Sequence, residues 1–247
     1  MCLLEEARDI GLRPSTFRDI ACRTLGRFPN QDNWSEYPNI WEEVRELVDS
    51  CPWYRVYDLI EAVVTHLTRY GTDSGTPSSP DDGSPAEVFS SLMNECLEES
   101  NVAWHVVDGE VRVRGTAMFE AQVERADAAL GDLEAATARR ELDEALKDLS
   151  RRPNPDLTGA VQHAMAAMEC LAREVTGSEK ATLGEIIKKT DLLPRPVDDA
   201  VAKMWGYASQ VARHVAEGSD VSTEEAELAV GLAATVVSYL AAKSQGS

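Results

Sequence analysis

The stretch NPDLTGAVQHAMAAMECLAREVTG, residues 154–177, indicates the fold of the second half of the chain. Asp156 is a residue type that accepts hydrogen bonds from free N–H groups at a helix start, and Gly177 is typical of a helix end. This spacing predicts one long amphipathic helix that packs on neighbouring helices. Its apolar stripe consists of Leu157, Val161, Met165, Met168, Leu171 and Val175.

Segments on both sides of this helix show the same kind of pattern. Upstream, ARRELDEALKDLSRR (138–152) carries leucine and alanine on one stripe. Downstream, two capping boxes, Thr182 with Glu185 and Ser222 with Glu225, open further helices. The most apolar stretch, LAVGLAATVVSYLAA at 228–242, is too short for a membrane span and is expected to be a buried helix. The second half is therefore predicted to be an all-α bundle of about four or five helices.

The first half is also expected to be helical, with one exception. Helical spacing runs through residues 3–70, and the turn formers of residues 71–85 predict a mobile loop. That loop ends in a helix start, where Ser84, Pro85 and Glu87 occupy capping positions. The exception is VAWHVVDGEVRVRG, in which β-branched and aromatic residues flank a two-residue turn of Asp and Gly. Residues 102–114 are thus predicted to form a β-hairpin.

These patterns predict a mainly α protein of two domains. The first, residues 1–132, is a helical module with one hairpin, and the second, residues 133–247, is the helical bundle. The 43 acidic and 24 basic residues give a formal charge of −19, most of which precedes residue 156. So acidic a molecule repels nucleic acid and anionic membranes, and any chemistry on RNA requires a local basic site.

The cysteines and the N-terminal segment bear on the cellular compartment. No pair of cysteines has the spacing of a zinc site, and all five are expected to be reduced thiols. Charged residues interrupt the N-terminal apolar run, which is not a secretory signal, and no later run reaches the length of a membrane span. We therefore expect a cytoplasmic protein that does not enter the membrane. The five cysteines are Cys2, Cys22, Cys51, Cys96 and Cys170.

One helix of the second half carries an unusual polar stripe. The stretch WGYASQVARHVAEG (205–218) belongs to a helix expected over about residues 197–216, in which apolar residues from Val197 onward form a core face. On the other side, polar residues recur at spacings of three and four. This stripe consists of Lys203, Tyr207, Gln210 and His214, with Arg213 at its edge.

Arg213 and His214 are the residue types that cleavage of RNA requires. A histidine titrates near neutral pH and can move the proton of a 2′-hydroxyl, and an arginine stabilises charge on the phosphate. Adjacent helix positions point about 100° apart, so one copy of the pair does not easily converge on one phosphate, whereas a partner protomer could complete the site. The alternative is structural, because both side chains are favourable near a helix C-terminus and Arg213 could pair with Glu217. The residue pattern alone favours the structural role, since motif matches this short arise often.

Other kinds of site are disfavoured. The remaining histidines, His66, His105 and His163, each stand alone on a predicted element without a second ligand at metal spacing, so no metal site is expected. No glycine-rich phosphate loop follows a strand, and no nucleophile elbow is present. The residues therefore predict no cofactor.

The second half resembles a HEPN domain of the abortive-infection type. The resemblance covers about residues 137–243 and lies in ELDEALKDLSRRPNPDLTGAVQHAMAAMECLAREVTG, ATLGEIIKK, WGYASQVARHVAEG and EEAELAVGLAATVVSYL. Upstream, LMNECLEESNVAWHVVDGEVRVRG and FEAQVERADAAL are similar to the N-terminal domain of AbiJ-like bacterial defence proteins. Together the two resemblances cover most of the chain.

The resemblance implies a bacterial protein of defence against phage. HEPN domains are helical bundles that dimerise and, when active, cleave RNA without a metal ion, so it implies a homodimer through the C-terminal domain and an RNA substrate. Arg213 matches the arginine of the family motif, and His214 matches the polar position next to it. Lys203, Tyr207 and Gln210 then form an RNA-binding or dimer stripe beside the motif.

The motif departs from the family pattern in one place. A second histidine is expected a few residues after the arginine, yet Gly218, Ser219 and Asp220 stand there, and no histidine follows His214. Two hypotheses follow. In the first, the chain is a metal-independent ribonuclease effector in which His214 does the acid–base work. In the second, it is a non-catalytic module that dimerises or binds a partner protein from a defence operon.

Overall fold

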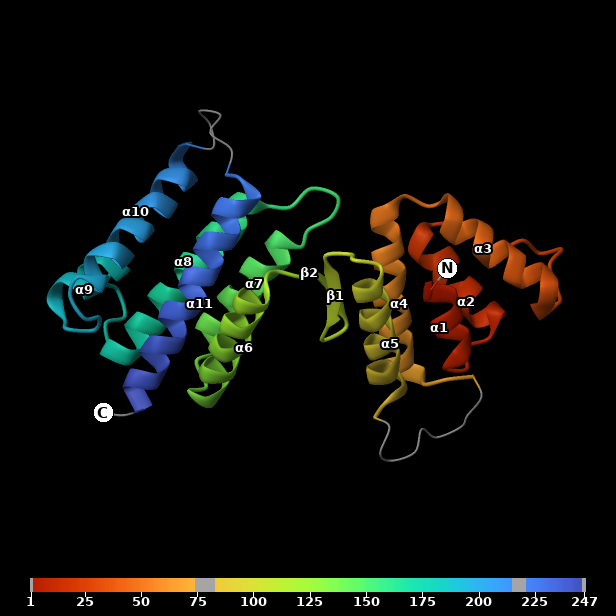
Figure 1. The fold of residues 1–247 in the computed structure, drawn as a ribbon, viewed down its shortest axis with the longest axis horizontal. Coiled ribbons are helices and arrows are strands. Elements are labelled where there is room, and N and C mark those ends of the chain that lie inside the picture. The colour runs from red at the N-terminus through yellow and green to blue at the C-terminus, as the bar shows by residue number, and fades with distance from the viewer. Residues whose placement is uncertain (1, 74–82, 215–220, 246–247) are drawn as a thin grey trace. The chain divides into compact units, whose positions relative to one another are not determined.

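The computed structural model describes residues 2–73, 83–214 and 221–245, except for the side chains of Cys2 and of residues 209–214. These residues contain eleven α-helices, a short π-type turn and one antiparallel hairpin, which confirms the prediction of a mainly α fold. The chain divides into two compact units, Met1–Arg114 and Gly115–Ser247 (Figure 1). Each unit has its own hydrophobic core.

The first unit is built around α4 and α5. Apolar side chains of these helices and of α1 and α2, among them Phe17, Leu59, Val63 and Phe89, are buried together. The predicted capping box at the start of α5 is confirmed, because Glu87 N–H donates to the Ser84 hydroxyl and the Glu87 carboxylate accepts Ser84 N–H. The elements in chain order are α1 (Cys2–Asp9), α2 (Pro14–Leu25), η1 (Glu36–Ile40), α3 (Trp41–Ser50), α4 (Trp53–Tyr70), α5 (Pro85–Glu99), β1 (Trp104–Val107) and β2 (Glu110–Val113).

The predicted hairpin is confirmed at β1 and β2. Asp108 and Gly109 have φ angles of 51° and 82°, and positive φ at both central residues is the signature of a type I′ turn. A hairpin of two strands is marginally stable alone, and here α4 and α5 hold it. The Asn94 side chain donates to the Val106 carbonyl at 3.0 Å and accepts Val106 N–H at 2.6 Å, while Glu61 accepts a backbone N–H of β2 at 2.8 Å.

The second unit surrounds α8, the helix of residues 154–177. Asp156 accepts Gly159 N–H at 2.8 Å, and Gly177 ends the helix with a φ of 65°, as predicted. Met168 and Leu171 of the predicted stripe are fully buried, and α8 packs against α7, α9, α10 and α11. The elements are α6 (Ala117–Asp132), α7 (Ala136–Leu149), α8 (Leu157–Thr176), α9 (Leu183–Lys189), α10 (Val197–His214) and α11 (Thr223–Gln245).

The helix α6 packs in the second unit, against α7 and α11. The compact units therefore divide at residues 114 and 115, whereas the sequence analysis divides the domains at 132 and 133. The boundary between the two sequence modules stays a prediction.

Two expectations from the sequence are wrong. Among the described residues one helix, α11, is long and apolar enough to cross a membrane by length and composition, although its many buried residues pack in the core of the second unit. The described thiols of Cys22, Cys51 and Cys170 are free, but Cys96 is disulfide-bonded, so not all cysteines are reduced. Burial raises the pKa of each of the three free thiols.

Candidate functional site

The helix α10 carries the predicted site residues. Its first turn contains Asp198 and Asp199, whose carboxylates are favourable at the positive end of the helix dipole. Its backbone is helical from Val197 to His214, which agrees with the predicted helix as far as the chain is described. Val201 and Ala208 of the predicted core face are buried, but Val197 is 45% exposed, because it lies in the first turn, outside the packed core.

Two of the five predicted site residues have described side chains. Lys203 and Tyr207 are on the exposed side of α10, and both line a pocket. The side chains of Gln210, Arg213 and His214 lie outside the described residues, as does the chain from 215 to 220. That Arg213 and His214 meet a phosphate therefore stays a prediction.

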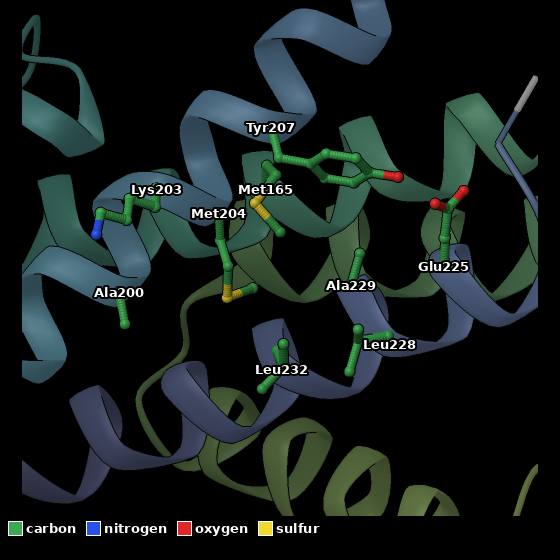
Figure 2. A pocket seen from close by; sticks show the side chains of 9 residues that line it. All are labelled: Met165, Ala200, Lys203, Met204, Tyr207, Glu225, Leu228, Ala229 and Leu232. Atoms are coloured by element: carbon green, nitrogen blue, oxygen red, sulfur yellow. The ribbon is translucent and has the colours of Figure 1, made fainter. Parts of the chain in front are cut away.

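The pocket lies between α8, α10 and α11 and has a volume of about 500 Å³ (Figure 2). Its lining is mostly apolar and includes two methionines, which are adaptable side chains. Polar groups stand at its rims, with Lys203 at one and Tyr207 with Glu225 at another. The lining residues are Met165, Ala200, Lys203, Met204, Tyr207, Glu225, Leu228, Ala229 and Leu232.

Tyr207 and Glu225 join α10 to the beginning of α11. The phenol of Tyr207 points toward the Glu225 carboxylate and donates a hydrogen bond to it (Figure 2). Burial, the charge of Glu225 and this hydrogen bond all raise the pKa of Tyr207, so at neutral pH the phenol is protonated and acts as a donor. The predicted capping box is also confirmed, since Glu225 accepts Ser222 N–H at 3.0 Å and Glu225 N–H donates to the Ser222 hydroxyl at 3.2 Å. Glu225 thus links the start of α11 to the middle of α10 beside the pocket.

The outer face of α11 is an apolar stripe. Leu228 is 62% exposed, Leu232 38% and Tyr239 41%. Exposed residues recur along this face at alternating intervals of four and three, the spacing by which helices pack in coiled coils. We call this face the α11 stripe; it consists of Leu228, Leu232, Thr235, Tyr239 and Ala242.

A second polar cluster joins α7 to α8. His163 Nδ1 lies 2.8 Å from Glu141 Oε2, and its Nε2 lies 3.8 Å from Asp148 Oδ2. Burial acts to raise the pKa of Glu141, but hydrogen bonds from His163 and Arg140 outweigh it and lower that pKa. Burial raises the pKa of Asp148, and the neighbouring charge of Asp156 adds to the effect. Although His163 was expected to stand alone, it therefore has two carboxylate neighbours.

Within the part of the chain that the structure describes, no group of three or more histidine, cysteine, aspartate or glutamate side chains is arranged to hold a metal ion. The pocket offers the single carboxylate of Glu225. Its described chemistry is therefore that of an apolar binding surface with a cation and a hydrogen-bond donor at its edges.

The N-terminal half of the chain shows its family. Residues 5–128, half of the chain, match the family described as AbiJ N-terminal domain 4. The chain belongs to this AbiJ family. The match runs from α1 through the hairpin and ends within α6, so the AbiJ-like resemblance read from the sequence is confirmed. The AbiJ domain indicates a role in abortive infection, a defence of bacteria against phage. No curated protein and no solved structure matches the chain.

Sequence reasoning on this AbiJ-family chain missed the α11 stripe. The helix is apolar on nearly every side, so its outward face has the same composition as its core face. One signal could have found it. A helix that is apolar all round is normally covered all round, so an exposed face on such a helix indicates a surface that a partner covers.

Proposed function

We propose that this AbiJ-domain protein is an abortive-infection effector whose second unit is a HEPN-type ribonuclease that needs no metal ion. It acts in the cytoplasm as a homodimer, in which Arg213 binds the phosphate of RNA and His214 moves the proton of the 2′-hydroxyl. The AbiJ domain supports the role in defence. The likeness of the second half to HEPN domains supports the chemistry.

The exposed α11 stripe is the observation that carries the dimer. It extends over four turns of helix, from Leu228 to Ala242, and contains no charged side chain. Contiguous apolar surface of this kind in a soluble protein marks an interaction site. A second copy is the simplest cover, because a two-fold axis places the same face of both protomers against itself.

A dimer also removes a geometric difficulty at the proposed cleavage site. Neighbouring positions of any α-helix are about 100° apart around its axis, so an arginine and a histidine adjacent in sequence do not easily meet one phosphate. Leu228 and Leu232 of the α11 stripe line the same pocket as Lys203 and Tyr207 of α10. Pairing through the stripe would therefore bring the α10 helices of two protomers to the same interface, where an arginine of one could act with a histidine of the other.

Incubation of the purified protein with total RNA tests the proposal. We expect cleavage that persists in EDTA and is abolished in Arg213→Ala and His214→Ala. Arg195→Ala is the matched control, because Arg195 precedes the same helix and its side chain is 88% exposed. Cleavage that EDTA abolishes would contradict a metal-independent mechanism. RNA left intact by the wild type would contradict the ribonuclease.

A non-catalytic module is the second candidate. It is favoured by the absence of histidine at positions 218–220 and by the apolar character of the pocket, which suits a protein contact better than a nucleotide. Such a module would use the α11 stripe to dimerise or to bind a partner protein of a defence complex, as a sensor or an accessory subunit. Intact RNA, together with weaker self-association of Arg213→Ala or His214→Ala, would support this candidate.

A further inference from the structure

The α11 stripe continues into the pocket with the spacing of a helix pair. Its residues follow one another at intervals of four and three, and one further step toward the N-terminus leads to Glu225, which lines the pocket. This spacing alternates between the two sides of the seam along which paired helices meet. On one side of the seam lie Glu225, Leu232 and Tyr239, and on the other lie Leu228, Thr235 and Ala242.

The two ends of α11 carry opposite charges. Its first turn contains Glu224 and Glu225, and its last turn contains Lys243. The Lys243 ammonium donates to the carbonyls of Asp191 at 2.7 Å and of Leu192 at 3.0 Å, which hold it at the helix end. A parallel pair of two copies would place like charges side by side, whereas an antiparallel pair places the acidic start of one helix at the level of the basic end of the other. Charge therefore favours an antiparallel pair of α11 helices.

One antiparallel register covers the whole stripe. Reversing one helix exchanges the two sides of its seam, so residues of one side meet residues of the other side. When Leu228 of one copy lies opposite Tyr239 of the other, Leu232 lies opposite Thr235. Sliding one helix by seven residues in either direction carries Leu228 or Tyr239 past an end of the partner helix, although these two side chains are 62% and 41% exposed. Only the first register buries both.

In this register Tyr239 of the second copy reaches the pocket between α10 and α11. Leu228, which it faces, lines the pocket together with Leu232 and Met204 (Figure 2). The volume of about 500 Å³ is enough for an aromatic ring, and contact between a methionine sulfur and an aromatic ring is favourable. The ring of one copy would thus close the pocket of the other.

We propose that α11 pairs with α11 of a second copy in antiparallel orientation, with Tyr239 of each copy in the pocket of the other. This inference rests on the homodimer of the proposed function and adds its register and a residue that the second copy contributes to the pocket. A helix of a different protein could match the apolar seam. The reversal of charge along α11 matches the helix to itself, and a two-fold axis repeats every contact of such a pair.

Disulfide cross-linking of cysteine variants of the full chain measures the register. Two cysteines form a disulfide only when their Cα atoms are within about 7 Å of each other. In the proposed pair, position 228 of one copy lies about 16 Å along the helix from position 228 of the other. Leu228→Cys alone and Tyr239→Cys alone should therefore form no covalent dimer. A mixture of the two variants, one of which carries a larger affinity tag, should form a covalent heterodimer.

Three controls accompany the cross-linking. A mixture of Thr235→Cys and Tyr239→Cys should give no heterodimer, because these positions lie about 10 Å apart along the proposed pair and are opposite only in a neighbouring register. Met118→Cys reports random collisions, since Met118 is 72% exposed and lies on α6. The oxidised wild type gives the background from the native cysteines.

A double-mutant cycle tests whether the ring lies in the pocket. Tyr239→Ala should raise the dissociation constant of the dimer about tenfold, as truncation of an interface hot spot does, and Tyr239→Phe should retain most of the association. Met204→Ala removes a contact of the same ring, so its effect and that of Tyr239→Ala should be less than additive. The effects of Met118→Gln and Tyr239→Ala should add. Unchanged circular dichroism would show that the variants are folded.

Several results would overturn the proposal. A covalent dimer of Leu228→Cys alone would show a parallel pair, and a mixture of Leu228→Cys with Tyr239→Cys that gives no heterodimer would exclude the register. Additive effects of Tyr239→Ala and Met204→Ala would place the ring outside the pocket. These results leave the proposed ribonuclease untouched, and RNA left intact by the wild type leaves the register untouched. A wild type that is always monomeric would contradict both this pairing and the homodimer of the proposed function.

Discussion

Replacing Leu228 and Leu232 by glutamine tests whether the α11 stripe is a dimer interface. Leu228 is 62% and Leu232 38% exposed, so together they offer the area of one whole leucine side chain per protomer. Burying a leucine side chain completely is worth about 1.5–3 kcal/mol. Because a two-fold interface uses each residue twice, the double variant loses about 3–6 kcal/mol of association free energy. This corresponds to a dissociation constant raised by about two to four powers of ten.

Sedimentation equilibrium over a dilution series measures this change directly. Glutamine is a good helix former and the replaced side chains are exposed, so the thermal unfolding of the separated protomer should change little. Met118→Gln is the control, because Met118 is 72% exposed and lies on α6, outside the stripe. The reasoning fails if the wild type is a monomer at every concentration, or if the double variant dimerises as tightly as the wild type. It also fails if Met118→Gln weakens the dimer to the same extent.

Four further substitutions concern stability and can be checked by urea unfolding. Thr182→Ala removes the hydroxyl that caps α9 and should lower the free energy of unfolding by about 1 kcal/mol, so an unchanged unfolding midpoint would contradict the role of this cap. Gly177→Ala places a side chain at a φ of 65° and should cost about 1–2 kcal/mol, although nothing lies within 4 Å of the added carbon. Gly206 lies inside α10 and is equally free of contacts, so Gly206→Ala should instead raise the free energy of unfolding by about 0.5–1 kcal/mol. If both glycine substitutions changed the stability in the same direction, backbone conformation would not explain their effects. Burial opposes ionisation of Glu141, but hydrogen bonds, chiefly from His163, outweigh it and lower the pKa of Glu141 below the ordinary 4.5. The ionised carboxylate therefore stabilises the folded state fully above pH 4.5, and this stabilisation is lost as the pH falls through the lowered pKa. The stability lost in Glu141→Gln should accordingly shrink as the pH falls from neutral to below 4.5, and a loss independent of pH would count against this pairing.

Local rules explain why much of the secondary structure could be predicted. The starts of α5, α8 and α9 depend on a side chain that accepts an N–H three residues further on, and each predicted cap forms the predicted hydrogen bond. The hairpin depends on two adjacent residues that tolerate positive φ, Asp108 and Gly109. The period of the α8 stripe likewise identifies the side that is buried. Each of these signals lies within a few residues of the structure it predicts.

The candidate site could be predicted only in part. The spacing along α10 separates Lys203 and Tyr207 from the buried Val201 and Ala208, because a helix turns by a constant angle per residue. The same rule says nothing about which helix stands opposite. The pairing of Tyr207 with Glu225 therefore had no signal in the sequence.

The sequence by itself determined the helices, their caps, the hairpin and the AbiJ family of the N-terminal half. Tertiary structure alone decided that Glu141 meets His163, that Tyr207 meets Glu225, and that one face of α11 stays exposed. The physical reason is the range of the interactions. Caps, turns and helical periods join residues within one or two turns of the chain, whereas these contacts join separate elements through packing, and composition does not specify which elements become neighbours.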